Sequence, residues 1–548
     1  MSFDDLLQKI GNFGTYQKRI FFFLCLPAIS CALHKLSGVF LLAKPDHRCQ
    51  LPDELPDATY SLPPDIMNSS YPYDSMTKKW SSCKMYTMNN NNTNSLSNSS
   101  QKCDHWIYDK SIFKNTAVME FNLVCNKNFY KGYSDSLLMV GVMLGSIIFG
   151  YVSDKIGRKH VFTISVWLQG IAGIGLALAP EFWSFAFLRV FVGASTSGLY
   201  MAAYVIGLEF VGSNKRMFVG VVMQMFFSVG FIVESIFGYI FTDWRYFQFA
   251  ITIPTFIFTS YVLFMPESVR WLLANDKKEE AVKLLKKIAR VNGVDMSSSD
   301  VLNILNNDDE EEKAEIHEEE KQKATFFDLF RHPAIRNRSF LVMLLWFVNS
   351  SAYYGISWST SSLGGNQFLV FSLMGLVEFP AYSFLLLTLN RWGRKINISG
   401  FMILAAMCLL TTLFVSKSNT WLMITCAMLA KLAITASYGA VYVYTAEQFP
   451  TVVRNRGLGV GSFFARIGGI MAPYINNTSD IWINMPLVIY GSLALLVGAW
   501  SLVLPETLNK ELPDTIEDLI ASSEKKYKPV KLEKETTFKE NKLKNDNV

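Results

Sequence analysis

Residues 149–159 read FGYVSDKIGRK and follow the apolar run SLLMVGVMLGSIIFG at residues 136–150. An apolar run of about 20 residues forms a helix long enough to cross the roughly 30 Å hydrocarbon core of a bilayer. The run therefore predicts a membrane-spanning helix, and the charged residues after it predict a tight turn in water. Asp154 is the only acid in this turn, beside Lys155, Arg158 and Lys159.

The composition extends this interpretation to the whole chain. Its 548 residues are 50% hydrophobic and only 18% charged, and the mean hydropathy is +0.22. Soluble domains average roughly 25% charged residues. Apolar runs of spanning length recur, whereas the alternating strands of about ten residues that build a barrel are not found. We therefore expect an all-α membrane protein that is embedded in the lipid bilayer.

Motifs of enzymes are missing from the sequence. It has no phosphate-binding loop, no zinc-type Cys/His spacing and no G-x-S-x-G string, which argues against an enzyme, an ATP-driven pump or a metal site. The net charge of +5 comes from basic residues beside apolar runs and does not indicate a nucleic-acid partner. No cofactor is expected. Na⁺ and H⁺ both stay open as coupling ions, and the oligomeric state stays open too, a monomer included.

The apolar runs predict twelve membrane-spanning helices. Their ranges are 20–42, 134–152, 161–180, 183–207, 217–241, 246–265, 339–360, 368–389, 396–415, 420–444, 457–475 and 483–504. An even number of spans places both termini on one side of the membrane. Lysine and arginine concentrate in the short loops on that side, after spans 2, 4, 8 and 10. The positive-inside rule therefore makes it the cytoplasmic side.

The loop at residues 43–133 supports the same orientation. It contains four cysteines and three N-x-S/T triplets, namely Cys49, Cys83, Cys103 and Cys125, with Asn68, Asn91 and Asn98. Four cysteines in one polar loop suit an oxidising compartment and two disulfides, for which three pairings are possible. We therefore expect a large, glycosylated extracellular loop.

Two short strings recur in the two parts of the chain. DKIGRK at 154–159 and NRWGRK at 390–395 each follow the second span of a half, and MPE at 265–267 and LPE at 504–506 each follow the last. Such a repeat suits two parallel halves with a central site between them. The expected organisation is a cytoplasmic N-terminus (1–19), a first six-helix half (20–265), a cytoplasmic linker (266–338), a second six-helix half (339–504) and a cytoplasmic tail (505–548).

The string GYVSDKIGRK (150–159) resembles the signature of the major facilitator superfamily between spans 2 and 3. In it, Gly150 would allow close helix approach and Gly157 a tight turn. More specific strings are PDHRC (45–49), PESVRWL (266–272), VNSSAYYG (348–355), VEFPAY (377–382), YTAEQFPTVVRNRG (444–457) and ARIGGIMAP (465–473). Together with the first loop, they resemble the organic cation, anion and zwitterion transporter family over about residues 10–510, and within it the insect organic cation transporter proteins.

This resemblance implies a gating role for the turn and for two arginines elsewhere. The residues are Gly150, Asp154, Gly157, Arg158, Lys159, Arg189 and Arg394. Asp154 is expected to latch the two halves on the cytoplasmic side in the outward-open state, and Asn390 at its place in the second copy predicts a weaker latch there. The alternatives are an ordinary basic loop for the turn and a structural brace for Arg189.

Two opposite charges within spans are the main candidates for selecting a substrate, because charge near the bilayer centre costs roughly 2.5–3.5 kcal/mol. Arg466 either pairs with an internal carboxylate or attracts a carboxylate of the substrate. The resemblance implies the second, since anion and zwitterion transporters of this family carry Arg at this point. Glu378 is an acid found in cation and carnitine-type relatives, and Tyr382 stands where anion transporters tend to have Lys. The alternative for Glu378 is an internal pair with Lys431 or Arg466.

Aromatic residues supply the remaining candidates. By their spacing, Trp346, Asn349 and Tyr353 share one face of span 7, next to Tyr354. The resemblance adds cavity positions at Tyr200, Gln224, Ser228 and Tyr438. Aromatic faces bind ammonium groups, although packing against lipid or protein is the alternative for any single aromatic side chain.

We therefore expect a transporter that moves small organic cations or zwitterions of the carnitine or amine type by alternating access. It is expected in the plasma membrane with both termini in the cytoplasm. The amine of the substrate would lie over Tyr353 and Trp346 near Glu378, and any carboxylate at Arg466. An organic-anion exchanger and a non-transporting ligand sensor of the same fold are the alternatives.

Overall fold

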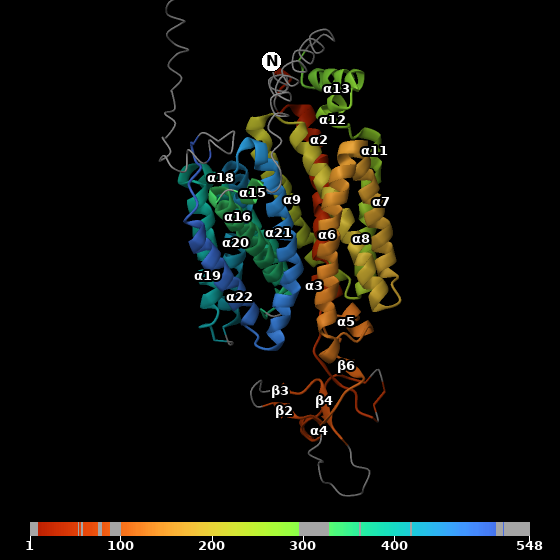
Figure 1. Cartoon of the computed structure of the whole chain (residues 1–548). Helices are drawn as coiled ribbons and strands as arrows, with labels where there is room; N and C mark the ends of the chain where they lie inside the picture. Colours follow the sequence, from red (N-terminus) through yellow and green to blue (C-terminus); the bar gives the residue numbers. More distant parts are fainter. Residues whose placement is uncertain are drawn as a thin grey trace, which may run out of the picture.

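The computed structural model describes residues 9–294 and 328–510, apart from residues 12, 53, 56–57, 75–78, 88–99, 332, 361–362 and 417–418, together with residue 519. Figure 1 shows two helical bundles that stand side by side, with a smaller lobe at one end. We call the side with this lobe the loop side. The opposite side, which carries α12 (Val269–Ala274) and α13 (Lys278–Val291), is the linker side.

The first half contains six spans. They are α2 (Thr15–Leu36) with its short extension α3 (Gly38–Leu41), α6 (Phe129–Ile156), α7 (Arg158–Ala177), α8 (Phe182–Glu209), α9 (Ser213–Ile240), and a sixth span made of α10 (Trp244–Thr252), the 3₁₀ segment η2 (Ile253–Ser260) and α11 (Tyr261–Phe264). Pro254 stands at the start of η2. Because proline has no backbone N–H to donate, the α-helix changes to 3₁₀ geometry there.

The second half repeats this arrangement. Its helices are α16 (Pro333–Trp358), α17 (Gln367–Leu376), α18 (Glu378–Trp392), α19 (Arg394–Thr411), α20 (Thr420–Gln448), α21 (Thr451–Asn477) and α22 (Met485–Ser501), with α15 (Asp328–Arg331) before them on the linker side. Helices α17 and α18 form one span that breaks at Val377. Pro380 causes the break, because its ring excludes the carbonyl four residues earlier. Glu378 therefore lies at a helix break near the middle of the span Gln367–Trp392.

Length and apolar composition identify the spans. Within the described residues, eleven helices are long and apolar enough to cross a membrane, and Met485–Ser501 is a shorter apolar helix. Each of the twelve predicted ranges overlaps one of these helices. The all-α membrane fold with twelve spans is confirmed.

Helices α6 and α8 approach so closely that only glycine fits between them. A side chain at Gly141 or Gly145 would collide with the backbone of α8, and one at Gly193 would collide with the backbone of α6. At Gly150, an added Cβ would meet only the Met201 methyl group, at 3.7 Å. The close approach expected at Gly150 is therefore wrong, because this residue lies beyond the region where the two backbones touch.

The lobe on the loop side is formed by the chain between α3 and α6. Its antiparallel strand pairs are β1 (His47–Cys49) with β6 (Trp106–Tyr108), β2 (Tyr73–Asp74) with β3 (Lys79–Trp80), and β4 (Lys84–Tyr86) with β5 (Ser100–Lys102), accompanied by α4 (Pro64–Ser70) and α5 (Ala117–Glu120). Its disulfides join Cys49 to Cys103 and Cys83 to Cys125. The structure thus selects one of the three possible pairings.

Arg48, in the PDHRC string, organises the start of the lobe. Its guanidinium donates to both carboxylate oxygens of Glu54, at 2.6 and 2.9 Å, and to the carbonyls of Thr59 and Tyr60. Burial opposes the charge on Glu54, but the hydrogen bonds from Arg48 outweigh it, so the pKa of Glu54 lies below its usual value. This part of the motif therefore stabilises the lobe.

Candidate substrate site

Glu378 and Lys431 form an ion pair at the centre of the second half. A carboxylate oxygen of Glu378 on α18 lies 3.1 Å from the ammonium nitrogen of Lys431 on α20, and both side chains are fully buried. A single charge at this depth would be costly, so each group stabilises the other. The internal partner considered for Glu378 is therefore Lys431 and not Arg466.

The ammonium group of Lys431 has three further partners. It donates a hydrogen bond of 2.7 Å to the Ser357 hydroxyl, and it lies 3.2 Å from the centre of the Tyr353 ring and 5.1 Å from that of Phe231. A carboxylate, a hydroxyl and aromatic faces are together the groups that proteins use to bind ammonium ions.

The ion pair also contacts the first half. The Ser228 hydroxyl on α9 donates to the second carboxylate oxygen of Glu378, and Phe231 lies one turn further along α9. Gly375, just before the break in the eighth span, packs against Ser228 and Phe231 so tightly that a side chain would collide with the Phe231 side chain. The site therefore lies at the interface of the two halves.

Aromatic side chains form a wall on the linker side of this pair. Tyr438 packs against Tyr353 and Trp346, at ring distances of 6.0 and 6.1 Å, and Tyr442 lies 4.3 Å from Trp346. Trp346 also donates from its indole nitrogen to the Thr445 hydroxyl, at 2.9 Å. Thus α16 and α20 contribute the wall together, and three of the predicted aromatic residues meet in it.

Two further cations lie near the aromatic wall. The Lys35 ammonium group lies 4.9 Å from the centre of the Tyr354 ring. Arg466 is close enough to interact electrostatically with the hydroxyls of Tyr354, Tyr438 and Tyr442 and with the Lys35 ammonium group. Within the described part of the chain, no carboxylate forms an ion pair with Lys35 or Arg466. These two charges are uncompensated, whereas that of Glu378 is neutralised.

The remaining predicted cavity residues lie at different places. Asn349 packs away from the pair, donating to the Leu345 carbonyl at 2.8 Å and to the Met402 sulfur at 3.8 Å. Gln224 lies one turn before Ser228 on α9 and is half-buried. Tyr200 on α8 stacks on Tyr204. The structure therefore does not bring Asn349 to the ion pair.

The sequence predicts Lys431 only as a partner of Glu378, and it does not predict Ser357 and Phe231 as site residues. A lone lysine in an apolar span is a visible signal, because such a charge needs a reason. Ser357 and Phe231 give no such signal, since small hydroxyl and aromatic residues are common in spans.

The predicted gating turn is held by the carboxylate of Glu267, which lies outside the turn. Gly157 has φ of 103°, a conformation that favours glycine. The carboxylate of Glu267 then accepts from the backbone N–H groups of Arg158 and Lys159, at 3.0 and 3.2 Å. Asp154 is 76% exposed and lies 3.1 Å from Arg158 in its own turn. In this state, Asp154 thus makes its ion pair within the first half, and the expected latch stays a prediction.

The other gating candidates have different partners. Arg189 lies 2.9 Å from Asp135, and both side chains are buried, an arrangement that braces α8 against α6. Arg394 binds Glu447 on α20, as Arg158 in the first turn lies near Glu209 on α8.

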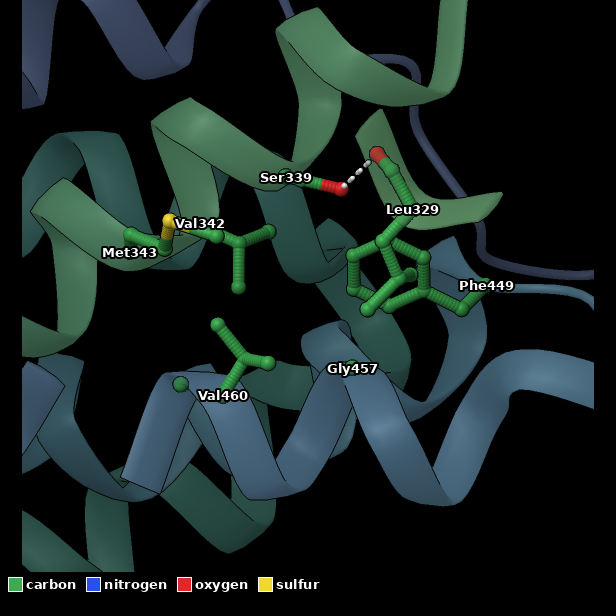
Figure 2. Close-up of a pocket in the computed structure, with 8 residues that line it drawn as sticks. Leu329, Ser339, Val342, Met343, Phe449, Gly457 and Val460 are labelled. Atoms are coloured by element: carbon green, nitrogen blue, oxygen red, sulfur yellow. Dashed lines mark hydrogen bonds between the residues drawn. The ribbon is translucent and has the colours of Figure 1, made fainter. Parts of the chain in front are cut away.

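Two other features of the described residues, one in the lobe and one on the linker side, do not suit an organic ion. His47 lies beside the sulfurs of Cys83 and Cys125, but these form a disulfide and have no thiolate to bind a metal. Figure 2 shows a small hollow between α15, α16 and α21, lined by apolar side chains such as Val342 and Val460. It has no charged group for an organic ion.

Of the predicted glycosylation acceptors, Asn68 is exposed and accepts a hydrogen bond of 3.1 Å from Trp80. Asn91 and Asn98 lie outside the described residues.

Comparison with known families decides the class of the protein. The model of the sugar (and other) transporter family matches residues 73–518. The chain belongs to this family. Its members are membrane transporters and not enzymes, so the chain is a multi-pass transporter.

Individual relatives narrow the similarity. The chain is 49% identical to an organic cation transporter protein of Drosophila melanogaster, over 94% of both chains. It is 46% identical to an organic cation transporter-like protein of the same species, over 94% of this chain and 92% of the relative. It is 32% identical to solute carrier family 22 member 3 of Rattus norvegicus, over 94% and 95%. The resemblance to the organic ion transporters is therefore confirmed.

Solved structures of the xylose transporter XylE of E. coli have the same fold. An inward open conformation matches with a TM-score of 0.60 at 16% identity, over 91% of this chain and 99% of the transporter. The proton:xylose symporter XylE bound to 6-bromo-6-deoxy-D-glucose matches with a TM-score of 0.59 at 18% identity, over 92% and 99%. The major facilitator fold is confirmed.

Proposed function

We propose that the protein carries small organic zwitterions, and cations with a polar tail, across the plasma membrane by alternating access. One relative in Drosophila melanogaster is named an organic cation transporter protein, and another an organic cation transporter-like protein. The observation that carries the proposed substrate class is the charge distribution of the central site. The acid Glu378 is paired with Lys431, whereas among the described residues Arg466 and Lys35 lack a carboxylate partner.

This distribution favours a substrate with both signs of charge. A simple cation would meet two uncompensated positive charges, which would repel it. A substrate carboxylate at Arg466 would compensate one of them, because guanidinium binds carboxylate with two parallel hydrogen bonds. The amine of the same molecule would then lie toward Glu378 and the Tyr353 ring.

We propose that the structure represents the state closed toward the outside. Contacts between the halves occur at the loop side, where Asn128 donates to Asp480 and Ser136 donates to the Ile470 carbonyl at 2.9 Å. Ser235 donates to the Phe368 carbonyl at 2.6 Å in the same region. If the disulfide-linked lobe is extracellular, the linker side and both termini are cytoplasmic, and the site would open toward the cytoplasm.

Arg466→Ala tests this function. We expect uptake of a carboxylated probe such as carnitine to fall at least about tenfold, the equivalent of one lost charge-assisted hydrogen bond. Uptake of tetraethylammonium, which has no carboxylate, should not fall, because the variant loses one of the two charges that repel a simple cation. The measurement is uptake of both labelled probes at matched surface expression, with Arg466→Lys as the control that keeps the charge. Equal loss of both probes would show that Arg466 is structural.

An organic-anion exchanger is the second candidate, and the two uncompensated cations favour it. A substrate panel distinguishes it, because only anions would then compete for uptake. In liposomes, saturable binding without movement of label would instead indicate the ligand sensor.

A further inference from the structure

Lys431 lies where the amine of a substrate is expected. The amine was predicted over Tyr353 near Glu378, and the Lys431 ammonium group lies 3.2 Å from that ring centre and 3.1 Å from that carboxylate. Ser357 and Phe231 complete the set of partners. The chain itself thus provides the ammonium group for its own ammonium site.

We infer that Lys431 is an internal substitute for the substrate ammonium group, which displaces it from Glu378 and Tyr353 during transport. The inference rests on the proposed function and deepens it. The amine of the substrate and Lys431 compete for the same carboxylate and the same aromatic face, so each occupies the site when the other has left.

A buried acid explains why a substitute is needed. Glu378 is fully buried, and removing one partner of a buried ion pair costs several kcal/mol. A carrier that reorients without substrate would meet this cost if the substrate were the only cation. Lysine suits the role because its ammonium group is a compact charge on a flexible stem.

The position of the pair connects the exchange of cations to the motion of the halves. The first half contributes the Ser228 hydroxyl that donates to Glu378 and the Phe231 ring that faces Lys431. An ammonium group of different size or reach at this place would change contacts across the interface. The identity of the bound cation therefore affects the equilibrium between the two states of the carrier.

Thermal unfolding of the purified full-length protein tests the inference without any transport assay. We expect Lys431→Ala to lower the unfolding temperature and methylammonium to restore it in a saturable way, because the small amine replaces the missing side chain. The wild type should respond less, and the double variant Glu378→Gln/Lys431→Ala should not respond. The inference would be overturned if methylammonium left the unfolding temperature of Lys431→Ala unchanged. It would also be overturned if methylammonium raised the unfolding temperature of the double variant as much as that of Lys431→Ala.

Lys431→Arg provides a second test that keeps the charge and the fold. The guanidinium fork holds a carboxylate more firmly than ammonium does, so the amine of the substrate should compete less well. We expect the KM for tetraethylammonium uptake to rise at least about fivefold at matched surface expression. An unchanged KM would show that position 431 is only a brace.

The two experiments separate the inference from the proposed function. If the wild type moves neither carnitine nor tetraethylammonium into liposomes, the proposed function fails, whatever methylammonium does. If the wild type transports them while Lys431→Ala ignores methylammonium and Lys431→Arg keeps its KM, the inference fails and the function stands.

Discussion

The two linker-side turns share a backbone design. The first turn (residues 154–159) contains Gly157 and the second turn (residues 390–395) contains Gly393, with φ of 103° and 94°. In each, a distant acid accepts from the first N–H groups of the next helix, Glu267 in the first half and Glu506 in the second. An acid at a helix N-terminus satisfies free N–H groups and interacts favourably with the helix dipole.

The arginines of the two turns are held differently. In the second turn, Arg394 binds one acid through two nitrogens, with its Nε 3.0 Å and its Nη2 3.1 Å from the carboxylate oxygens of Glu447. In the first, Arg158 lies 3.1 Å from Asp154 and 3.5 Å from Glu209. The first arginine is shared between two acids, so one of them can leave without leaving it unpaired. Only the first turn can thus exchange a partner at low cost.

The largest effect should come from breaking the shared backbone design. We expect Gly157→Ala and Gly393→Ala each to destabilise the protein by about 1–3 kcal/mol, because positive φ is unfavourable for alanine and the new Cβ would collide with the Glu267 or Glu506 carboxylate. Thermal unfolding measures this. Gly400→Ala is the matched control, since its Cβ would meet nothing within 4 Å. If Gly157→Ala is as stable as this control, the turn does not need glycine.

An intermediate loss of stability is expected when the acid partner of Arg394 is removed, and a smaller loss when one acid partner of Arg158 is removed. We expect Glu447→Gln to destabilise by roughly 2 kcal/mol, because it leaves Arg394, which is 13% exposed, without its acid. Glu209→Gln should cost less than about 1 kcal/mol, since Arg158 keeps Asp154. Unfolding of the two variants under identical conditions gives the comparison. Equal losses would mean that Asp154 gives Arg158 no useful support.

The spans could be predicted from the sequence because bilayer thickness sets their length directly. The disulfides could not, since three pairings of four cysteines are equivalent on paper. The signature predicts a close helix contact at Gly150, but in the structure Gly141 and Gly145 make it. All three lie in one glycine-containing run, and which glycine meets the neighbour depends on the rotation and crossing point of α6, which no local pattern records.

The sequence predicts the charged residues of the site, but not how they pair with one another. Glu378, Lys431 and Arg466 stand out because each is a lone charge in an apolar run. Their pairing depends on the break at Pro380 and on how α20 is rotated, and both are set by packing across the bundle. Sequence reasoning therefore found the charged groups but not which of them is already neutralised.

The smallest effect on stability, and the most specific effect on transport, is expected from Asp154→Asn. Asp154 is 76% exposed and Arg158 keeps Glu209 nearby, so stability should change by less than about 0.5 kcal/mol. The predicted latch forms only in the outward-open state, and its loss should slow transport at normal surface expression. Asp154→Glu, which keeps the acid in the first turn, is the matched control and should leave the rate close to normal. A normal rate for Asp154→Asn would reject the latch, and the shared arginine would then be a purely structural variant of the second turn.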